Sequence, residues 1–269
     1  MGSSLSLHRR HVAAGMVAML MAIPMTARAA APDEYAELLS QRAASIVTIK
    51  YVLKVQGAGS GDQEAESEVT GVMIDPKGLI LCSNTQLGGY VSMMRRMAPG
   101  RFSNVTATPT DLKVLIGDDT EGIKAKVLAA DTELDLAWIE IVEPGDRTFK
   151  AVDFAKGAPT KTGQRLLSIR QMDKFFDRLL VVGEGHIGGV TTKPRRLYVP
   201  GGDLSGELGM PVFTPAGKVA GLIVLQMPDG EGGGGNPMRM QELMGGLILP
   251  AAEVAKATAR ARAGAEEEE

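Results

Sequence analysis

The sequence predicts an all-β protein made of two six-stranded antiparallel β-barrels, with a short helix at each end. In residues 46–55 apolar and polar side chains alternate, so that Val47 and Ile49 point one way and Thr48 and Lys50 the other. Further strand-like runs follow at short intervals, bounded by turn residues and not separated by helical patterns. The chain also has 33 glycines and only 4% aromatic residues. This composition favours many tight turns between short strands.

The predicted elements fall into two sets of six strands. The first six are residues 46–55, 68–74, 79–83, 112–116, 123–129 and 134–142, and the second six are 165–171, 179–191, 196–199, 211–214, 218–227 and 246–249. Residues 33–44 and 251–263 read as helices. We therefore expect a first unit over 30–150, a second unit over 151–264 that includes the closing helix, and a solvated acidic tail over 265–269.

The first 29 residues have the pattern of a secretory signal peptide. Arg9 and Arg10 precede a short apolar run over residues 12–25, and Ala27-Arg28-Ala29 matches a small-x-small cleavage site. The run is short for a membrane span and contains a proline. We expect an exported, periplasmic or extracellular protein with no stable membrane span after cleavage, and an uncleaved anchor is the alternative.

Charge and cysteine content exclude several classes of function. Removing residues 1–29 leaves 26 basic and 32 acidic residues, a net charge of −6, which gives no general affinity for nucleic acid or anionic lipid. The single cysteine, Cys82, excludes an intrachain disulfide and zinc sites built from several Cys or His ligands, and we expect no metal or other cofactor. The only histidine beyond the signal segment is His186, which lies in a predicted strand of the second barrel and is expected to be structural.

Four ordered segments carry a resemblance to a known family. The segment TGVMIDPKGLIL at 70–81 is similar to the hairpin GSGVIIS-x-x-GYILT, and 124–141, with DTELDLA, is similar to A-x-V-x-x-x-D-x-x-TDLAVLKI. GMPVF through GKVAG at 209–221 resembles GGPLVN-x-x-GEVIGI, and GLILP at 246–250 resembles GFAIP. Together these segments resemble the trypsin-fold serine proteases, closest to the HtrA-type branch, over roughly residues 35–260. The resemblance implies a trypsin-like double barrel, and no PDZ domain is expected to follow.

The resemblance also implies where a catalytic triad would lie. Such a protease needs a serine to attack, a histidine to take its proton and an aspartate to orient the histidine. The aspartate position is filled by Asp135, but Thr85 stands at the histidine position and Leu208 at the serine position. The former oxyanion loop would comprise Gly206, Glu207 and Gly209. Because a threonine hydroxyl does not accept a proton near pH 7, no catalytic residue is expected and the chain reads as a pseudoprotease.

Three functions compete. The first is a non-catalytic module that binds a protein or peptide in the cleft between the barrels or by strand addition at the exposed edge of the second barrel. The second is an active serine-type endopeptidase with a non-standard nucleophile, Ser205 or Cys82, although neither has a histidine partner. The third is a structural component of the cell envelope.

Two further features bear on these functions. We expect Asp135, without an imidazole partner, to be satisfied by the Thr85 hydroxyl and nearby backbone N–H groups, unless it merely caps the turn after Glu133. Residues 87–111, rich in methionine, and 228–244, rich in glycine, are predicted to be long loops, either flexible insertions or adaptable recognition surfaces.

Overall fold

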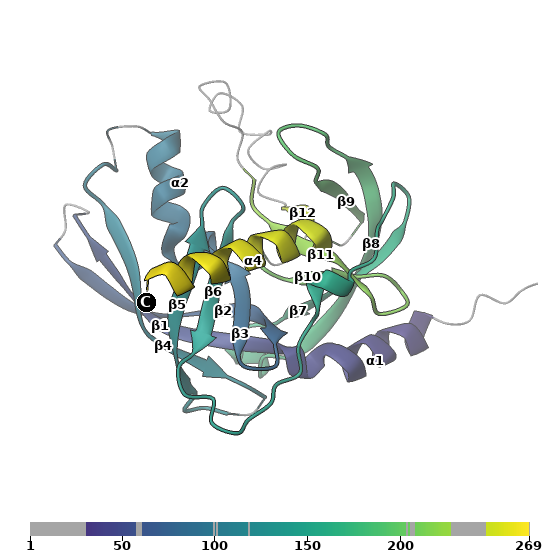
Figure 1. The fold of residues 1–269 in the computed structure, drawn as a ribbon, viewed down its shortest axis with the longest axis horizontal. Helices are drawn as coiled ribbons and strands as arrows, with labels where there is room; N and C mark the ends of the chain where they lie inside the picture. The colour runs from purple at the N-terminus through teal and green to yellow at the C-terminus, as the bar shows by residue number, and fades with distance from the viewer. Residues whose placement is uncertain are drawn as a thin grey trace, which may run out of the picture. The chain divides into compact units, whose positions relative to one another are not determined.

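Twelve strands close into two antiparallel barrels (Figure 1). The computed structural model describes residues 31–57, 61–98, 100, 102–117, 119–202, 204, 208–226 and 246–268, and residues 31–269 form a single compact unit. The prediction of an all-β fold with two six-stranded antiparallel barrels and terminal helices is therefore confirmed.

The first barrel has the strand order β1-β2-β3-β6-β5-β4. Its strands are β1 (Ile46–Gln56), β2 (Gln63–Asp75), β3 (Leu79–Ser83), β4 (Thr106–Leu115), β5 (Ile123–Asp131) and β6 (Leu136–Ile141). The β1–β2 ladder is the longest, because it runs without interruption from Ile46 opposite Val72 to Val55 opposite Gln63. β3 pairs with β6 along its whole length, which brings the end of β3 beside the start of β6.

The second barrel has the order β10-β11-β12-β9-β8-β7. Its strands are β7 (Arg165–Gln171), β8 (Leu180–Val190), β9 (Tyr198–Gly202), β10 (Pro211–Phe213), β11 (Val219–Val224) and β12 (Leu247–Pro250). The seam between β9 and β12 is short, since Ile248 opposite Tyr198 is its one register pair among the described residues.

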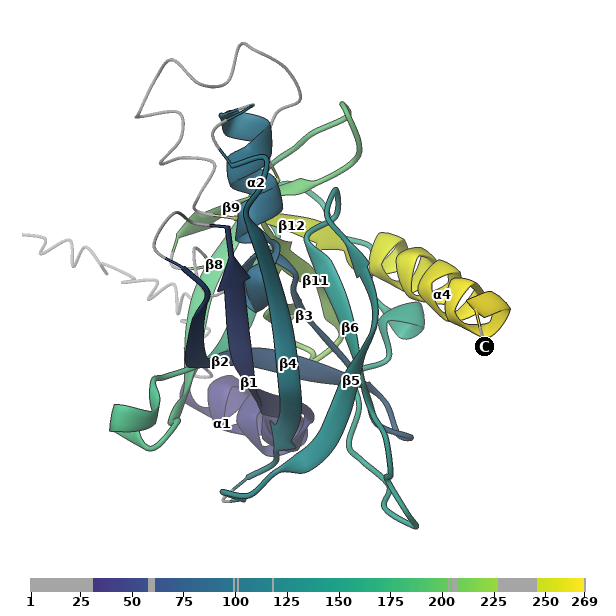
Figure 2. The same cartoon turned by 90° about the vertical axis from the view of Figure 1, so that its left-hand side faces the viewer.

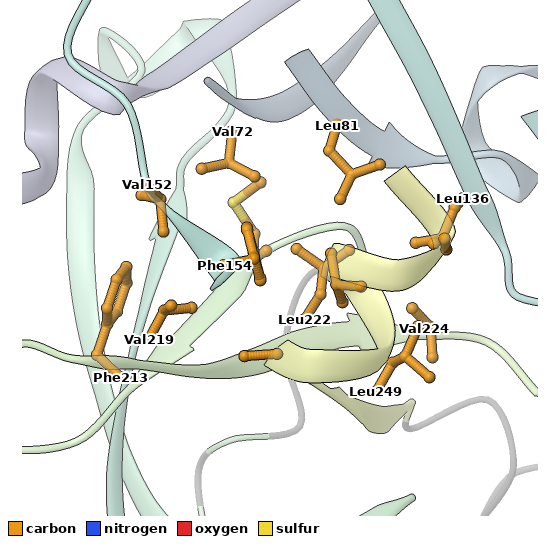
Figure 3. Packing of buried hydrophobic residues seen from close by; sticks show 14 of the residues in the cluster. Val72, Leu81, Leu136, Val152, Phe154, Phe213, Val219, Leu222, Val224 and Leu249 are labelled. Carbon is orange, nitrogen blue, oxygen red and sulfur yellow. The ribbon is translucent and has the colours of Figure 1, made fainter. Parts of the chain in front are cut away.

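Each barrel has its own apolar interior, and a third cluster joins the two barrels (Figure 3). In the joining cluster, Leu81 and Leu136 of the first barrel pack with Leu222 and Val224 of the second, and Phe154 of the linker lies among them. Burial of such side chains contributes about 1.5–3 kcal/mol each. The barrels therefore share a core, and the ends of β3 and β6 lie at the junction.

The terminal helices fasten the barrels from outside. α1 (Ala31–Arg42) is tied to the second barrel, where Glu34 pairs with Arg165, and α4 (Ala251–Glu268) contacts strands of both barrels. Figure 1 shows α4 lying across the front of the molecule. On α4, the Thr258 hydroxyl accepts a hydrogen bond of 3.0 Å from the Trp138 indole. Among the described residues, no helix combines the length and apolarity needed to cross a membrane.

The structure differs from the sequence prediction at several places. Residues 85–97, expected to lie largely in a loop, form the single-turn π-helix η2 (Thr85–Gly89) and the helix α2 (Tyr90–Met97), which stands at one end of the first barrel (Figure 2). β2 and β4 begin earlier than predicted, at Gln63 and Thr106. The acidic run, expected to be a solvated tail, forms the exposed last turn of α4, which ends at Glu268. The predicted loop over 228–244 lies outside the described residues.

Candidate functional site

Asp135 lies at the junction of the barrels, directly before β6, and a tight turn places it there. The carboxylate of Asp131 accepts hydrogen bonds from the backbone N–H groups of Glu133 (3.0 Å) and Leu134 (2.9 Å), which closes the turn between β5 and β6. The backbone of Asp135 then adopts φ 57°, a left-handed conformation that aspartate tolerates better than most residues. The side chain is only 2% exposed.

Donors from both barrels surround the Asp135 carboxylate. The Ser83 hydroxyl, at the end of β3, lies 3.0 Å from each carboxylate oxygen, and the Thr85 N–H donates to Oδ1 at 2.7 Å. From the second barrel, the N–H of Leu225, just after β11, donates to Oδ2 at 2.8 Å. The backbone carbonyl of Asp135 also accepts from the Asn84 N–H at 3.2 Å. The residue thus ties β3, η2 and the end of β11 together.

Burial dominates the electrostatics of this cluster. Loss of solvation raises the pKa of Asp135, and the hydrogen bonds from Leu225, Thr85 and Ser83 offset that rise only in part. Burial likewise raises the pKa of the Cys82 thiol, and the charge of Asp135 adds to that rise. The carboxylate is therefore held by hydrogen bonds in a site whose burial makes the charged form less favourable than it is in water.

The expectation that hydrogen bonds satisfy Asp135 is confirmed for the backbone N–H groups. The expected hydrogen bond from the Thr85 side chain also lowers the pKa of Asp135. The Ser83 hydroxyl, which the sequence did not predict, lies within hydrogen-bond distance of both carboxylate oxygens. The alternative, a residue that only caps its own turn, does not describe bonds that reach Leu225 in the other barrel.

Leu208 reaches the same junction through its neighbour Gly209. Gly209 has φ +83°, and a β-carbon placed on it would lie 2.7 Å from the backbone nitrogen of Ser83. Glycine is therefore required there, and the segment lies directly against the end of β3. Leu208 itself is half-buried and packs on the apolar interior of the second barrel. The structure thus brings Thr85 and Asp135 into contact. Leu208 lies beside Gly209, which packs against the end of β3.

The other predicted site residues fall elsewhere. Ser205, Gly206 and Glu207 lie outside the described residues. Cys82 is fully buried in β3, opposite Ala137 of β6, and its raised pKa keeps it a neutral thiol. His186 is exposed on β8, where its ring lies against Gly201 of β9.

Comparison with known proteins agrees with this architecture. The model of the trypsin-like peptidase domain family matches residues 69–222, which is more than half of the chain. The chain therefore belongs to the trypsin-like peptidase domain family, and the trypsin-fold resemblance carried by the sequence motifs is confirmed.

Among solved structures, the chain is similar to one described as "Crystal structure of Deg5", with a TM-score of 0.54 and 16% sequence identity. The similarity covers 84% of this chain and 92% of that chain, and at this identity it concerns the fold. No curated protein matches the chain.

Sequence reasoning missed two members of the cluster, Ser83 and Leu225. Ser83 lies two residues before Thr85 at the end of a strand, and nothing in the local pattern marks it as a partner of an aspartate 52 residues later. Leu225 donates through its backbone, so its side chain carries no signal. Only the closure of both barrels brings these groups together.

Proposed function

We propose that this chain is an exported pseudoprotease that binds a protein or peptide at the junction of its two barrels. The observation that carries the proposal is the hydrogen bonding of Asp135. In a serine protease this carboxylate accepts a hydrogen bond from the catalytic histidine and orients it. Here its oxygens accept from Ser83, Thr85 and Leu225, so the group acts as a tie between the barrels.

The neighbouring chemistry supports the absence of a conventional nucleophile and base. Thr85 at the histidine position has no group that takes up a proton near neutral pH. Leu208 at the serine position is half-buried and packs against the apolar interior of the second barrel. The alternative, an active endopeptidase using Cys82, is disfavoured by the burial of that thiol and its raised pKa. For the alternative using Ser205, the histidine in the described part of the chain is His186, on the exposed face of β8, and we propose that it does not serve as the base.

Covalent probes test the loss of catalysis. The purified full chain is treated with a fluorophosphonate and, separately, with iodoacetamide, and labelled sites are mapped by mass spectrometry. We expect neither Ser205 nor Cys82 to be labelled in the folded protein. Fluorophosphonate labelling that disappears in Ser205→Ala, or iodoacetamide labelling that disappears in Cys82→Ala, would establish the alternative enzyme.

Site-specific crosslinking tests binding. A photo-crosslinking amino acid replaces Gln226, which follows Leu225 and whose amide donates to the Glu133 carbonyl at 2.7 Å. The matched control replaces Arg147, in the segment that pairs with the turn before β3, at the other end of the first barrel. In the native envelope we expect polypeptide crosslinks from position 226 and not from position 147. Equal crosslinking at both positions, or none at either, would contradict binding at the junction.

A further inference from the structure

The hairpin tip between β7 and β8 carries the most exposed large apolar side chains of the described part of the chain. In this β7–β8 tip, residues 172–179, Phe175 is 83% exposed, Leu179 61% and Phe176 52%. The two phenyl rings contact each other edge to face, with centroids 5.1 Å apart. Apolar side chains clustered in this way at an apex indicate an interaction surface, whereas isolated ones do not.

Hydrogen bonds hold the tip in one conformation. The Asp173 carboxylate accepts from the Phe175 N–H at 2.8 Å and caps the short helix η4 (Lys174–Phe176), and the Met172 N–H donates to the Leu179 carbonyl at 2.9 Å. Arg178 fastens the tip to the first barrel through the Glu68 carboxylate, at 2.9 and 3.0 Å.

The backbone of the tip is also costly to form. Asp177 and Arg178 both adopt left-handed conformations, with φ 53° and 52°. Such conformations cost of order 1 kcal/mol each in a residue other than glycine. The tip therefore keeps its two phenyl rings exposed, although its backbone at the next two residues is costly to form.

The small area of the patch and the charged residues around it limit the kind of surface that can bind to it. The three side chains offer at most about 400 Å², and a stable protein interface needs about 800 Å² from each partner. The patch does not extend over the neighbouring sheet, because ion pairs of Arg178 with Glu68 and of Lys50 with Glu66 cover that surface. A convex apex of this area is too small for a stable dimer with a second copy, but it is large enough to enter the interfacial region of a bilayer.

We propose that the β7–β8 tip inserts Phe175, Phe176 and Leu179 into the interfacial region of a zwitterionic lipid bilayer. The 30 residues that precede α1 contain the apolar run 12–25, which is typical of a signal segment that directs a chain to a membrane for export. Asp173 and Asp177 flank the rings together with Lys174 and Arg178, so the tip carries no net charge, and the chain carries −3; attraction to anionic lipid therefore contributes little. The tip thus attaches the barrels to a membrane surface through apolar contact and without spanning the bilayer.

A local fluorescent reporter tests insertion in the full chain. Phe175→Trp places an indole at the apex, and the native Trp138, which is 2% exposed, supplies a constant background. The control chain carries Val142→Trp, at an exposed position just after β6. Both chains are mixed with phosphatidylcholine vesicles whose acyl chains are brominated near the headgroup. Because each reporter senses its own surroundings, lipid binding by the N-terminal 30 residues does not obscure the result.

With vesicles, the Phe175→Trp emission is expected to shift to the blue and to be quenched by the bromines, and the Val142→Trp emission to do neither. The shift should persist at about 1 M salt, where the Debye length is about 3 Å. Adding Phe176→Ser and Leu179→Ser to the reporter chain should lower lipid partitioning of the tip at least about tenfold.

Three results would overturn the proposal. The first is an apex indole that stays in water when vesicles are present. The second is a blue shift without lipid that grows with protein concentration, which would assign the tip to a second copy. The third is a blue shift produced only by extracted envelope proteins, which would assign it to a protein partner.

Discussion

Asp135→Ala removes the acceptor that the Ser83 hydroxyl and the N–H groups of Thr85 and Leu225 share. A buried donor left without a partner costs about 1–3 kcal/mol. The Ser83 hydroxyl can turn to another acceptor, so the two N–H groups make the larger part of the loss. The variant also regains some stability, because it no longer buries a carboxylate whose pKa is raised by desolvation. The net loss of unfolding free energy should be about 2–4 kcal/mol.

Thermal unfolding followed by circular dichroism measures this loss. For a chain of this size each kcal/mol lowers Tm by about 2–4 °C, so a decrease of about 5–15 °C is expected. Alanine in a left-handed conformation adds its own penalty, and Asp111→Ala controls for it, since Asp111 has φ 53° but is exposed. If the two variants lose the same stability, the hydrogen bonds of Asp135 contribute nothing and the role of the residue as a tie between the barrels is refuted.

Three further predictions concern the same junction and the closing helix. Because the pKa of Asp135 is raised by burial, the folded state binds its proton more tightly than the unfolded state, so its contribution to stability should increase as pH falls through the folded pKa. Urea unfolding of the wild type and of Asp135→Asn between about pH 7.5 and 4.5 should show the wild type gaining relative to the variant, and a parallel pair of curves would contradict this. Gly209→Ala should cost about 2–4 kcal/mol because its β-carbon meets the backbone of β3, whereas Gly163→Ala, with a similar φ of +81° and no atom within 4 Å, should cost only about 1 kcal/mol. Thr258→Val leaves the buried indole N–H of Trp138 without its acceptor and should cost about 1–2 kcal/mol, read as a lower urea midpoint; an unchanged midpoint would show that the bond is dispensable.

Strand positions can be predicted from the sequence where one face of the strand is buried, because apolar residues then alternate with polar ones. They cannot be predicted where both faces are exposed. β1 alternates clearly and its predicted and observed bounds differ by one residue. The first part of β2, residues 63–68, is exposed except at Ser67, so no apolar period marks it. These residues form a strand because β1 pairs with them, for example Lys54 opposite Glu64. Such pairing across a ladder leaves no local signal.

Helix prediction failed for a related reason. α2 has only eight residues, and its N-cap residue, Gly89, offers no side-chain hydrogen bond, so the usual signals of a helix start are absent. The sequence therefore predicts a loop for these methionines. α4 extends beyond its predicted end because alanine and glutamate favour helix. Arg262 on its last turns also pairs with Asp75 at 2.5 Å.

The position of Asp135 at the junction could be predicted from the family motif, but its partners could not. Ser83 and Leu225 are separated from it by 52 and 90 residues, and they meet it only after both barrels have closed. A pattern search finds the carboxylate because its neighbours in sequence are distinctive. It does not find a hydroxyl and a backbone N–H whose role depends on tertiary contact alone.

The geometry of the junction explains why an aspartate suits this position. The site needs an acceptor that reaches β3, η2 and the end of β11 at once, and a carboxylate offers two oxygens for this purpose. Asparagine would present one oxygen and one NH₂ group, so either Thr85 or Leu225 would face a donor. The residue must also accept a left-handed backbone, which alanine and branched side chains resist. An aspartate with these partners holds the two barrels together through its own hydrogen bonds, so its presence alone is no evidence of catalysis.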